Sequence, residues 1–212
     1  MFVLKTVPDK ATYGLVIHLI YFLLFLSCGN AVASEQENWN LSIQQDGIEV
    51  YTKKVPGSRI DAFKATTMIS AEYDRVKEVI LDYPNYPKWY QDYKKGEILE
   101  QSSPEKIVVR FVIDAPFPIK DRDSVNRVSV QQTDEHVKVT LESAPTFIPQ
   151  NNKQIRMNVS SGRWTLEKNG NQTRVTIEYH ADPQIPVPSW LSNRYVVQGP
   201  AKSLSNLKKR LQ

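Results

Sequence analysis

The chain is nearly free of cysteine. Among its 212 residues Cys28 carries the one thiol, and it follows the most apolar stretch of the sequence. Loss of the first 33 residues, argued below, would leave a protein without cysteine. The remaining chain therefore needs neither disulfide bonds nor thiol chemistry, even in a compartment that oxidises thiols.

Sequence motifs for metal, phosphate and acyl chemistry are also lacking. His136 and His180 are the histidines beyond the N-terminal segment, and neither stands in metal-ligand spacing with carboxylates. There is no Gly-rich phosphate loop and no local Ser-His-Asp motif. We therefore expect no catalytic residue, no metal site and no cofactor, although residues distant in sequence could still meet in space.

Neither sign of charge is in large excess. The 27 Lys and Arg residues and the 23 Asp and Glu residues give a formal net charge of +4, which is too small to indicate a nucleic-acid partner. The densest basic cluster, residues 208–210, stands at the end of a predicted helix, where cations suit the helix dipole. Attraction to an anionic membrane is the alternative, so a transient membrane contact stays open.

Residues 1–33 have the layout of a secretory signal peptide. Charged residues precede an apolar run, 14–26, and Ala-Val-Ala follows at 31–33. The run is shorter than the about 20 residues that span a bilayer. We predict cleavage after Ala33 and export to a bacterial periplasm. Secretion, an uncleaved anchor and a lipid attached to Cys28 are the alternatives.

Strand patterns dominate residues 34–212, which form one predicted domain. Apolar and polar residues alternate from Trp39 onward, and Asp46-Gly47 marks a hairpin turn. A meander of strands over residues 96–181 indicates an antiparallel sheet with one wet face. A change of alternation predicts a β-bulge at residues 160–162.

Two helical segments accompany the strands. Ser70 is the predicted N-cap of a helix that ends at Leu81, and apolar residues recur at helical spacing over residues 189–211. Pro200 should kink this last helix or divide it in two. The aromatic, proline-broken segment 82–93 either fills a corner of the core or forms the rim of a pocket.

The strand run 107–113 is apolar on both faces apart from Arg110. An arginine in such a place must find a carboxylate or a polar ligand group. An ion pair with Asp114 or Asp123 is one interpretation, and an anchor for the polar end of a lipid is the other.

A long helix that stands off a curved sheet leaves an elongated apolar cavity, whereas a closely packed helix seals the core. If the cavity is present, either the helix or a facing loop at residues 144–149 would have to move to admit a ligand. The candidate lining residues are Arg110, Val112, Trp164, Tyr195 and Val197.

Several landmarks occur in a fixed order along residues 39–211. They are Trp39 with the hairpin 46–51, Asp82 with Trp89, the Pro-Phe-Pro and Asp-Arg-Asp connector 116–123, Arg156 with Gly162 and Trp164, and Asp182-Pro183 followed by Trp190-Leu191. In this order they resemble a bacterial-type START domain, the steroidogenic acute regulatory protein-related lipid-transfer domain of the helix-grip superfamily.

The resemblance implies an α+β helix-grip fold, with a curved antiparallel sheet of about nine strands that grips a long C-terminal helix around a cavity. It implies a protein that carries a lipid or other hydrophobic molecule in a tunnel without bond chemistry. We also expect a monomer. Arg122 and Asp123 would be structural and brace the connector. An enzyme of the same superfamily, such as a cyclase or hydrolase, and a scaffold with a sealed core are the alternatives.

Overall fold

The computed structural model describes residues 38–184 and 189–212. The predicted signal peptide, its cleavage site and Cys28 lie outside the described residues. None of the helices in the described part is both long and apolar enough to cross a membrane.

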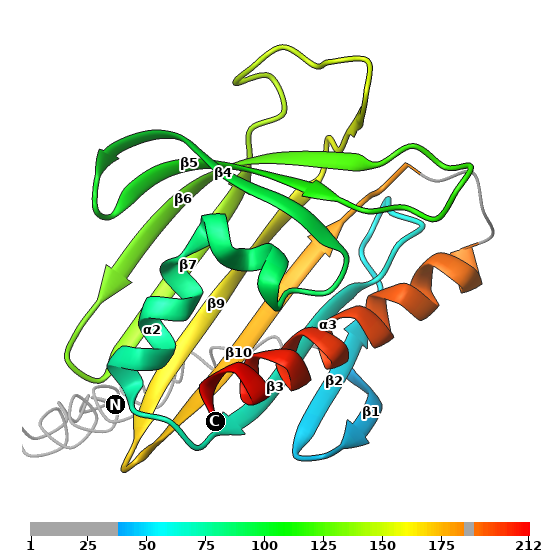
Figure 1. The fold of residues 1–212 in the computed structure, drawn as a ribbon. Coiled ribbons are helices and arrows are strands. Elements are labelled where there is room, and N and C mark those ends of the chain that lie inside the picture. The colour runs from blue at the N-terminus through cyan, green and yellow to red at the C-terminus, as the bar shows by residue number, and fades with distance from the viewer. Residues whose placement is uncertain (1–37, 185–188) are drawn as a thin grey trace, which may run out of the picture. The chain divides into compact units, whose positions relative to one another are not determined.

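A ten-stranded sheet forms the domain (Figure 1). Neighbouring strands follow the order β1-β2-β3-β10-β9-β7-β6-β5-β4, all antiparallel, and the short β8 pairs with β6 in parallel. The sheet is open, so the predicted α+β helix-grip architecture is confirmed with ten strands instead of about nine. The strands are β1 (Asn40–Gln45), β2 (Ile48–Lys53), β3 (Ala62–Ile69), β4 (Tyr93–Ser103), β5 (Lys106–Ile113), β6 (Arg122–Gln132), β7 (His136–Ser143), β8 (Ile155–Arg156), β9 (Ser160–Asn169) and β10 (Gln172–Ala181).

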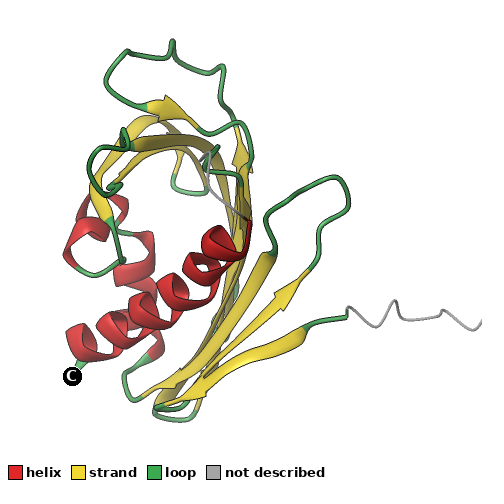
Figure 2. Ribbon diagram, turned by 90° about the vertical axis from the view of Figure 1, so that its right-hand side faces the viewer, coloured by secondary structure: helices red, strands yellow, loops and turns green. Residues whose placement is uncertain are grey.

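The helices lie on one side of the sheet, which bends around them (Figure 2). They are α2 (Tyr73–Leu81), the short 3₁₀-helix η1 (Tyr83–Lys88) and α3 (Ser189–Leu211). The long α3 lies against β2 and β3, whereas α2 lies against β9 and β10. We call this side of the sheet the concave face and the other side the convex face.

Two details of the helices differ from the sequence-based expectation. Glu72, not Ser70, is the N-cap of α2, because the helix begins at Tyr73. The Ser70 hydroxyl instead accepts a hydrogen bond from Gln172 on β10 (3.2 Å). Pro200 does not divide α3, which is one continuous helix. Burial of apolar side chains on the C-terminal side of Pro200 offsets the backbone hydrogen bond that this residue cannot donate.

The predicted bulge at residues 160–162 is wrong, because the long run is two strands. β8 ends at Arg156 and β9 begins at Ser160. The intervening residues change the face on which side chains stand, so that Arg156 meets Asp123 on the convex face while Trp164 enters the concave core. A bulge is therefore unnecessary to explain the change of alternation.

Alternation along β5 decides which of its side chains face the helices. Val109 and Phe111 join the large core between the sheet and the helices. Val108 instead packs with Val125 and Ala144 in a small cluster on the convex face. Both faces of this strand are therefore covered, as its two-sided apolar pattern indicates.

Gly162 allows an aromatic ring to lie across the concave face. It pairs with Tyr179 on the neighbouring β10, and a Cβ atom added at Gly162 would collide with the Tyr179 ring and with the Glu178 carbonyl oxygen. The carbonyl belongs to the sheet and cannot move aside as a flexible side chain would. The absence of a side chain at this position therefore holds Tyr179 in place.

We predict that Gly162→Ala lowers the free energy of unfolding by about 1–3 kcal/mol, because the added methyl group overpacks the β9–β10 pair. Urea denaturation followed by tryptophan fluorescence measures the change. Gly199→Ala in α3 is the matched control, since no atom lies near the added methyl group; it should be neutral or stabilising by about 0.5–1 kcal/mol. Equal effects of the two substitutions would contradict the assignment.

Candidate functional site

A cluster of aromatic rings occupies one side of the concave face. Tyr86 stacks on Phe111 with 5.2 Å between ring centroids, and Trp89 meets Trp164 edge-on at 6.0 Å. The rings belong to Tyr83, Tyr86, Trp89, Tyr90, Tyr93, Phe111 and Trp164. The segment 82–93 therefore contributes to the core, as one of its two interpretations expected.

The C-terminal half of α3 is firmly packed on this cluster. Leu204 is fully buried, and the Ser203 hydroxyl accepts a hydrogen bond from the Gln91 N–H (3.0 Å). The Asn206 side-chain amide donates to the Trp89 carbonyl (3.0 Å). Apolar burial and hydrogen bonds together hold this half of the helix to the end of η1.

The N-terminal half of α3 makes looser contact with the sheet. Tyr195 is 58 % exposed, and Val197 is half-buried against the core. The Asn193 side chain accepts a hydrogen bond from the Asp61 N–H (3.1 Å). Among the described side chains of α3, the buried leucines, Leu204, Leu207 and Leu211, all lie in the C-terminal half, whereas Ser192 is the buried side chain among those described before Pro200.

On the concave side, several apolar and aromatic side chains remain half-buried against the core. They are Phe63, Tyr90, Tyr93, Ile113 and Tyr179. Burial nevertheless raises the pKa of Tyr90 and Tyr93, and it raises the pKa of Tyr179 to about 12 although a hydrogen bond from Ser160 opposes the shift. These tyrosines are thus surrounded by protein and still keep accessible surface.

A group of uncharged polar side chains stands on the same part of the concave face. The Tyr179 hydroxyl lies 2.8 Å from the Ser160 hydroxyl, and the Asn126 amide donates to the Ser160 carbonyl. Among the described residues, the Ser124 hydroxyl and the Asn126 carbonyl oxygen have no hydrogen-bond partner although both side chains are buried. The same holds for the Tyr83 hydroxyl and the Trp89 indole N–H in the aromatic cluster. Buried polar atoms without a partner are costly, so Ser124 and Asn126 are available to the polar group of a ligand.

The convex face carries a buried ionic network instead. The Asp123 carboxylate accepts hydrogen bonds from Arg110 Nε (2.8 Å) and from Arg156 Nε (3.0 Å) and a terminal Arg156 nitrogen (2.9 Å). Arg110 also donates to Glu97 (3.0 Å) and to Gln154 (3.1 Å). Of the two carboxylates predicted as partners for Arg110, Asp123 is therefore the one that binds it.

The predicted lining residues divide between the two faces. Arg110 and Val112 lie on the convex face, because β5 directs its even-numbered side chains away from α3. This placement removes both from the space beneath the helix. Trp164 and Val197 are on the concave side, where Trp164 is buried in the aromatic cluster, and Tyr195 lies on the exposed part of α3.

The expectation for the loop 144–149 also needs correction, because this loop packs on the convex face. Phe147 and Ile148 cover Val125, and Arg156 donates a hydrogen bond to the Ile148 carbonyl (3.1 Å). The loop therefore does not face α3 and cannot open the space beneath it.

Arg122 fastens the connector that precedes β6 to the end of β10. Its guanidinium donates to the carbonyls of Lys120, Pro183 (2.7 Å) and Gln184 (3.2 Å). Backbone carbonyls beyond β10 are thereby held close to the start of β6.

The described residues contain no group of three or more His, Cys, Asp or Glu side chains that could hold a metal ion. His180 contacts Ser58 (3.1 Å), but the same nitrogen lies 3.2 Å from the Ile60 carbonyl, to which the Ser58 hydroxyl also donates. Ser58 and His180 therefore both contact the carbonyl of a local turn, which explains why they lie close together.

Ser124 and Asn126 are the site residues that sequence reasoning missed. The signal for them was present, since they continue the alternation of Val128 and Val130 along the concave side of β6. Polar residues at two successive core positions are unusual in a strand that is otherwise apolar on that face. The sequence pattern instead favoured a polar contact at Arg110, which lies on the convex face.

The comparisons with known proteins agree on one family. The family model of the START domain matches residues 30–212. A Pseudomonas aeruginosa protein without an assigned function is 32 % identical over 187 residues, covering 87 % of this chain and 91 % of that protein. Mouse phosphatidylcholine transfer protein is 27 % identical, with 82 % of this chain and 84 % of that protein covered. The crystal structure of a STAR-related lipid transfer protein fragment from Xanthomonas axonopodis matches with a TM-score of 0.74 and 29 % identity, covering 82 % of this chain and 98 % of that one.

We predict that the Asp123 network makes the fold sensitive to acid. Burial alone would raise the pKa of Asp123, but hydrogen bonds from Arg156 and Arg110 hold it below its usual value of 3.8. A carboxylate with a lowered pKa contributes stability that is present above the unfolded-state pKa and is lost as pH falls through the folded-state pKa. Asp123→Asn should therefore cost about 3–5 kcal/mol at neutral pH, and less as the pH falls below about 4.

Urea denaturation at neutral and acidic pH measures this difference. Asp74→Asn serves as a control, because Asp74 forms a surface ion pair with Lys77 (2.7 Å) and should matter little at either pH. If the difference in unfolding free energy between wild type and Asp123→Asn is the same at neutral and acidic pH, the ionisation of Asp123 is not linked to stability.

Proposed function

Because this chain belongs to the START domain family, we propose that it binds one lipid in a hollow beneath the N-terminal half of α3 and transfers it between membranes. The observation that carries the proposal is the uneven packing of α3, which is tight around Leu204 and loose around Val197. A helix sealed against the sheet along its whole length would leave no room for a ligand.

The half-buried tyrosines of the concave side support a hollow between the sheet and α3. Tyr90, Tyr93 and Tyr179 have pKa values raised by burial and yet keep accessible surface, as expected of side chains that border an internal space. Transfer of an acyl chain from water to such a space contributes about 0.8 kcal/mol per CH₂ group, so ten carbons contribute about 8 kcal/mol. Tight binding therefore needs few polar contacts.

The polar end of the ligand meets uncharged groups in this proposal. The unpartnered Ser124 hydroxyl can donate a hydrogen bond and the unpartnered Asn126 oxygen can accept one, next to the Ser160–Tyr179 pair. A hydroxyl or carbonyl at the end of a lipid fits these partners, because it satisfies them without bringing a charge into the interior. We therefore propose a lipid with a neutral polar end.

Entry of the lipid requires α3 to move at its looser half. Pro200 lacks the N–H that would donate one helical hydrogen bond between the two halves, and Asn193 ties the N-terminal half to Asp61. Displacement of this half would uncover the hollow while the C-terminal half keeps its contacts. Such gating by one helix accounts for exchange without unfolding of the domain.

The connector before β6 is the proposed membrane contact. Phe117 is 97 % exposed between two prolines, and Arg122 fastens this connector to the carbonyls of Pro183 and Gln184 beyond β10. An exposed aromatic ring in a stiff loop suits insertion at a bilayer interface. Contact there would place the membrane next to the moving half of the helix.

Export is the proposed localisation, on the strength of the composition of residues 1–33. We also propose that the protein acts as a monomer and without catalysis. The enzyme alternative predicts chemical change of the bound lipid, and the sealed scaffold predicts no bound lipid at all.

Native mass spectrometry of the protein purified from a lipid-containing host tests the proposal. We expect a complex with one lipid, which organic extraction releases chemically unaltered. Preparations from several hosts that all lack bound lipid would contradict the proposal, and a released molecule that is a reaction product would favour the enzyme.

We predict that Ser124→Ala weakens binding of a fluorescent long-chain alcohol by about two- to tenfold, the value of one hydrogen bond. Binding of the matching probe with a methyl end should not change. Thermal stability should be unchanged or slightly higher, because the Ser124 hydroxyl has no protein partner in the described structure. Ser129→Ala, at an exposed position of the same strand, is the control; equal loss for both probes would refute a polar contact at Ser124.

We predict that Phe117→Ala slows lipid transfer between vesicles by several-fold, since removal of the ring reduces membrane contact by about 1.5–3 kcal/mol at most. The amount of lipid bound at equilibrium should stay the same. Transfer of a fluorescent lipid between labelled vesicles measures the rate. Leu41→Ala removes an apolar side chain that is 53 % exposed on the edge strand β1 and should have no effect on transfer; a similar slowing by both substitutions would argue against a specific contact.

A further inference from the structure

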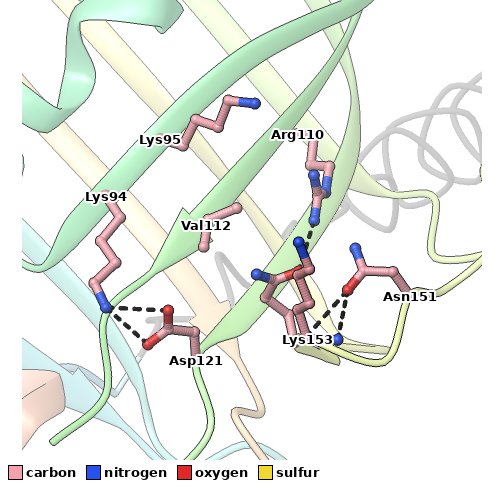
Figure 3. A pocket seen from close by; sticks show the side chains of 8 residues that line it. Lys94, Lys95, Arg110, Val112, Asp121, Asn151 and Lys153 are labelled. Carbon is pink, nitrogen blue, oxygen red and sulfur yellow. Dashed lines mark hydrogen bonds and ion pairs between the residues drawn. The ribbon is translucent and has the colours of Figure 1, made fainter.

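A pocket of about 470 Å³ lies on the convex face, on the other side of β5 from the concave core (Figure 3). β4 supplies Lys94 and Lys95, β5 supplies Arg110, and the loop before β8 supplies Asn151, Lys153 and Gln154. Its volume lies within the range of about 300–1,000 Å³ that is usual for small-molecule sites. Neither the family nor the lipid proposal accounts for it.

Cationic side chains predominate around this pocket. Lys94, Lys95, Arg110 and Lys153 border it, against the one carboxylate of Asp121. Figure 3 shows Lys95 and Arg110 extending towards the pocket from neighbouring strands. Cations from three separate chain segments thus converge on one concavity.

Nearby carboxylates neutralise part of this charge. Asp121 and Asp114 pair with Lys94, and Glu97 pairs with Lys95 at 2.6 Å. Asp123 and Glu97 both contact Arg110 from beneath the pocket. These pairs fix the lysines and the arginine in position, so a ligand would meet groups that are already ordered.

Donors nevertheless remain available in the pocket. The Lys153 ammonium takes part in no hydrogen bond or ion pair within the part of the chain that the structure describes. Arg110 uses three N–H groups for Asp123, Glu97 and Gln154, which leaves two of the five that a guanidinium carries. Free donors on a fixed arginine beside an unpaired lysine are suited to an oxyanion.

We propose that this convex pocket binds the phosphate group of a small phosphate ester. Lys153 and the two free N–H groups of Arg110 contact the phosphate oxygens, and the Asn151 side chain lies beside them. Val112, which is buried in the wall of the pocket, offers an apolar contact for the carbon part of the ester. The site is separate from the concave face, so it stands or falls independently of lipid carriage.

Isothermal titration calorimetry with the whole purified protein tests this site. The probes are glycerol 3-phosphate, inorganic phosphate and, as the uncharged control, glycerol. We expect glycerol 3-phosphate to bind, glycerol not to bind, and Lys153→Ala to weaken binding by about fivefold or more. Lys106→Ala removes an exposed lysine from the far end of β5 and should change affinity by less than about twofold, because solvent and salt screen its charge.

Vesicles containing phosphatidylglycerol separate the two sources of a phosphate ester. Binding of the vesicles that Lys153→Ala abolishes assigns the pocket to a lipid headgroup, whereas binding of soluble glycerol 3-phosphate alone assigns it to a free ester. The proposal is overturned if wild-type protein binds no phosphate ester at about 10 mM. Equal weakening by Lys153→Ala and Lys106→Ala also overturns it, since the attraction would then come from overall charge.

Discussion

The carboxylate of Asp123, shared between Arg110 and Arg156, is the interaction on which the arrangement of both faces depends. It joins β5, β6 and β8 on the convex side, and two arginines compensate the cost of burying it. With Asp123 fixed outward, the two-residue period of β6 directs Ser124 and Asn126 inward. One buried ionic contact thereby determines which polar groups a ligand on the concave face would meet.

The interior depends on a second feature, the difference in packing between the two halves of the continuous helix α3. Leu204 and its neighbours supply enough buried surface to hold the helix in place, so the other half is free to serve a different purpose. Loosely packed elements open at low free-energy cost and are therefore the ones that ligands displace. In the proposed mechanism, stability and ligand exchange would therefore depend on different parts of one helix.

Much of this fold can be predicted from the sequence, because periodicity and turn residues act locally. The Asp46-Gly47 hairpin forms with both residues at positive φ, and the last helix ends at Leu211 as its apolar spacing indicates. The faces of β5 could not be assigned, because both are apolar and only the packing of the loop with Phe147 on one of them separates the two. Arg110 was therefore expected in the interior, whereas its partner Asp123 lies on the convex side.

The assignment of faces also decides what kind of ligand each side can hold. The concave polar group near Asn126 is uncharged, and an anionic headgroup placed there would lose its hydration without meeting a fixed cation among those side chains. The cations of this region, Arg110 and Lys153, stand on the other face, where solvent can still reach a ligand. Under the two proposals, neighbouring residues of the same strands would separate recognition of a neutral lipid end from recognition of a phosphate. A lipid that contacted both the uncharged concave group and the convex cations would have to extend around the edge of the sheet. We therefore expect two separate ligands, one on each face.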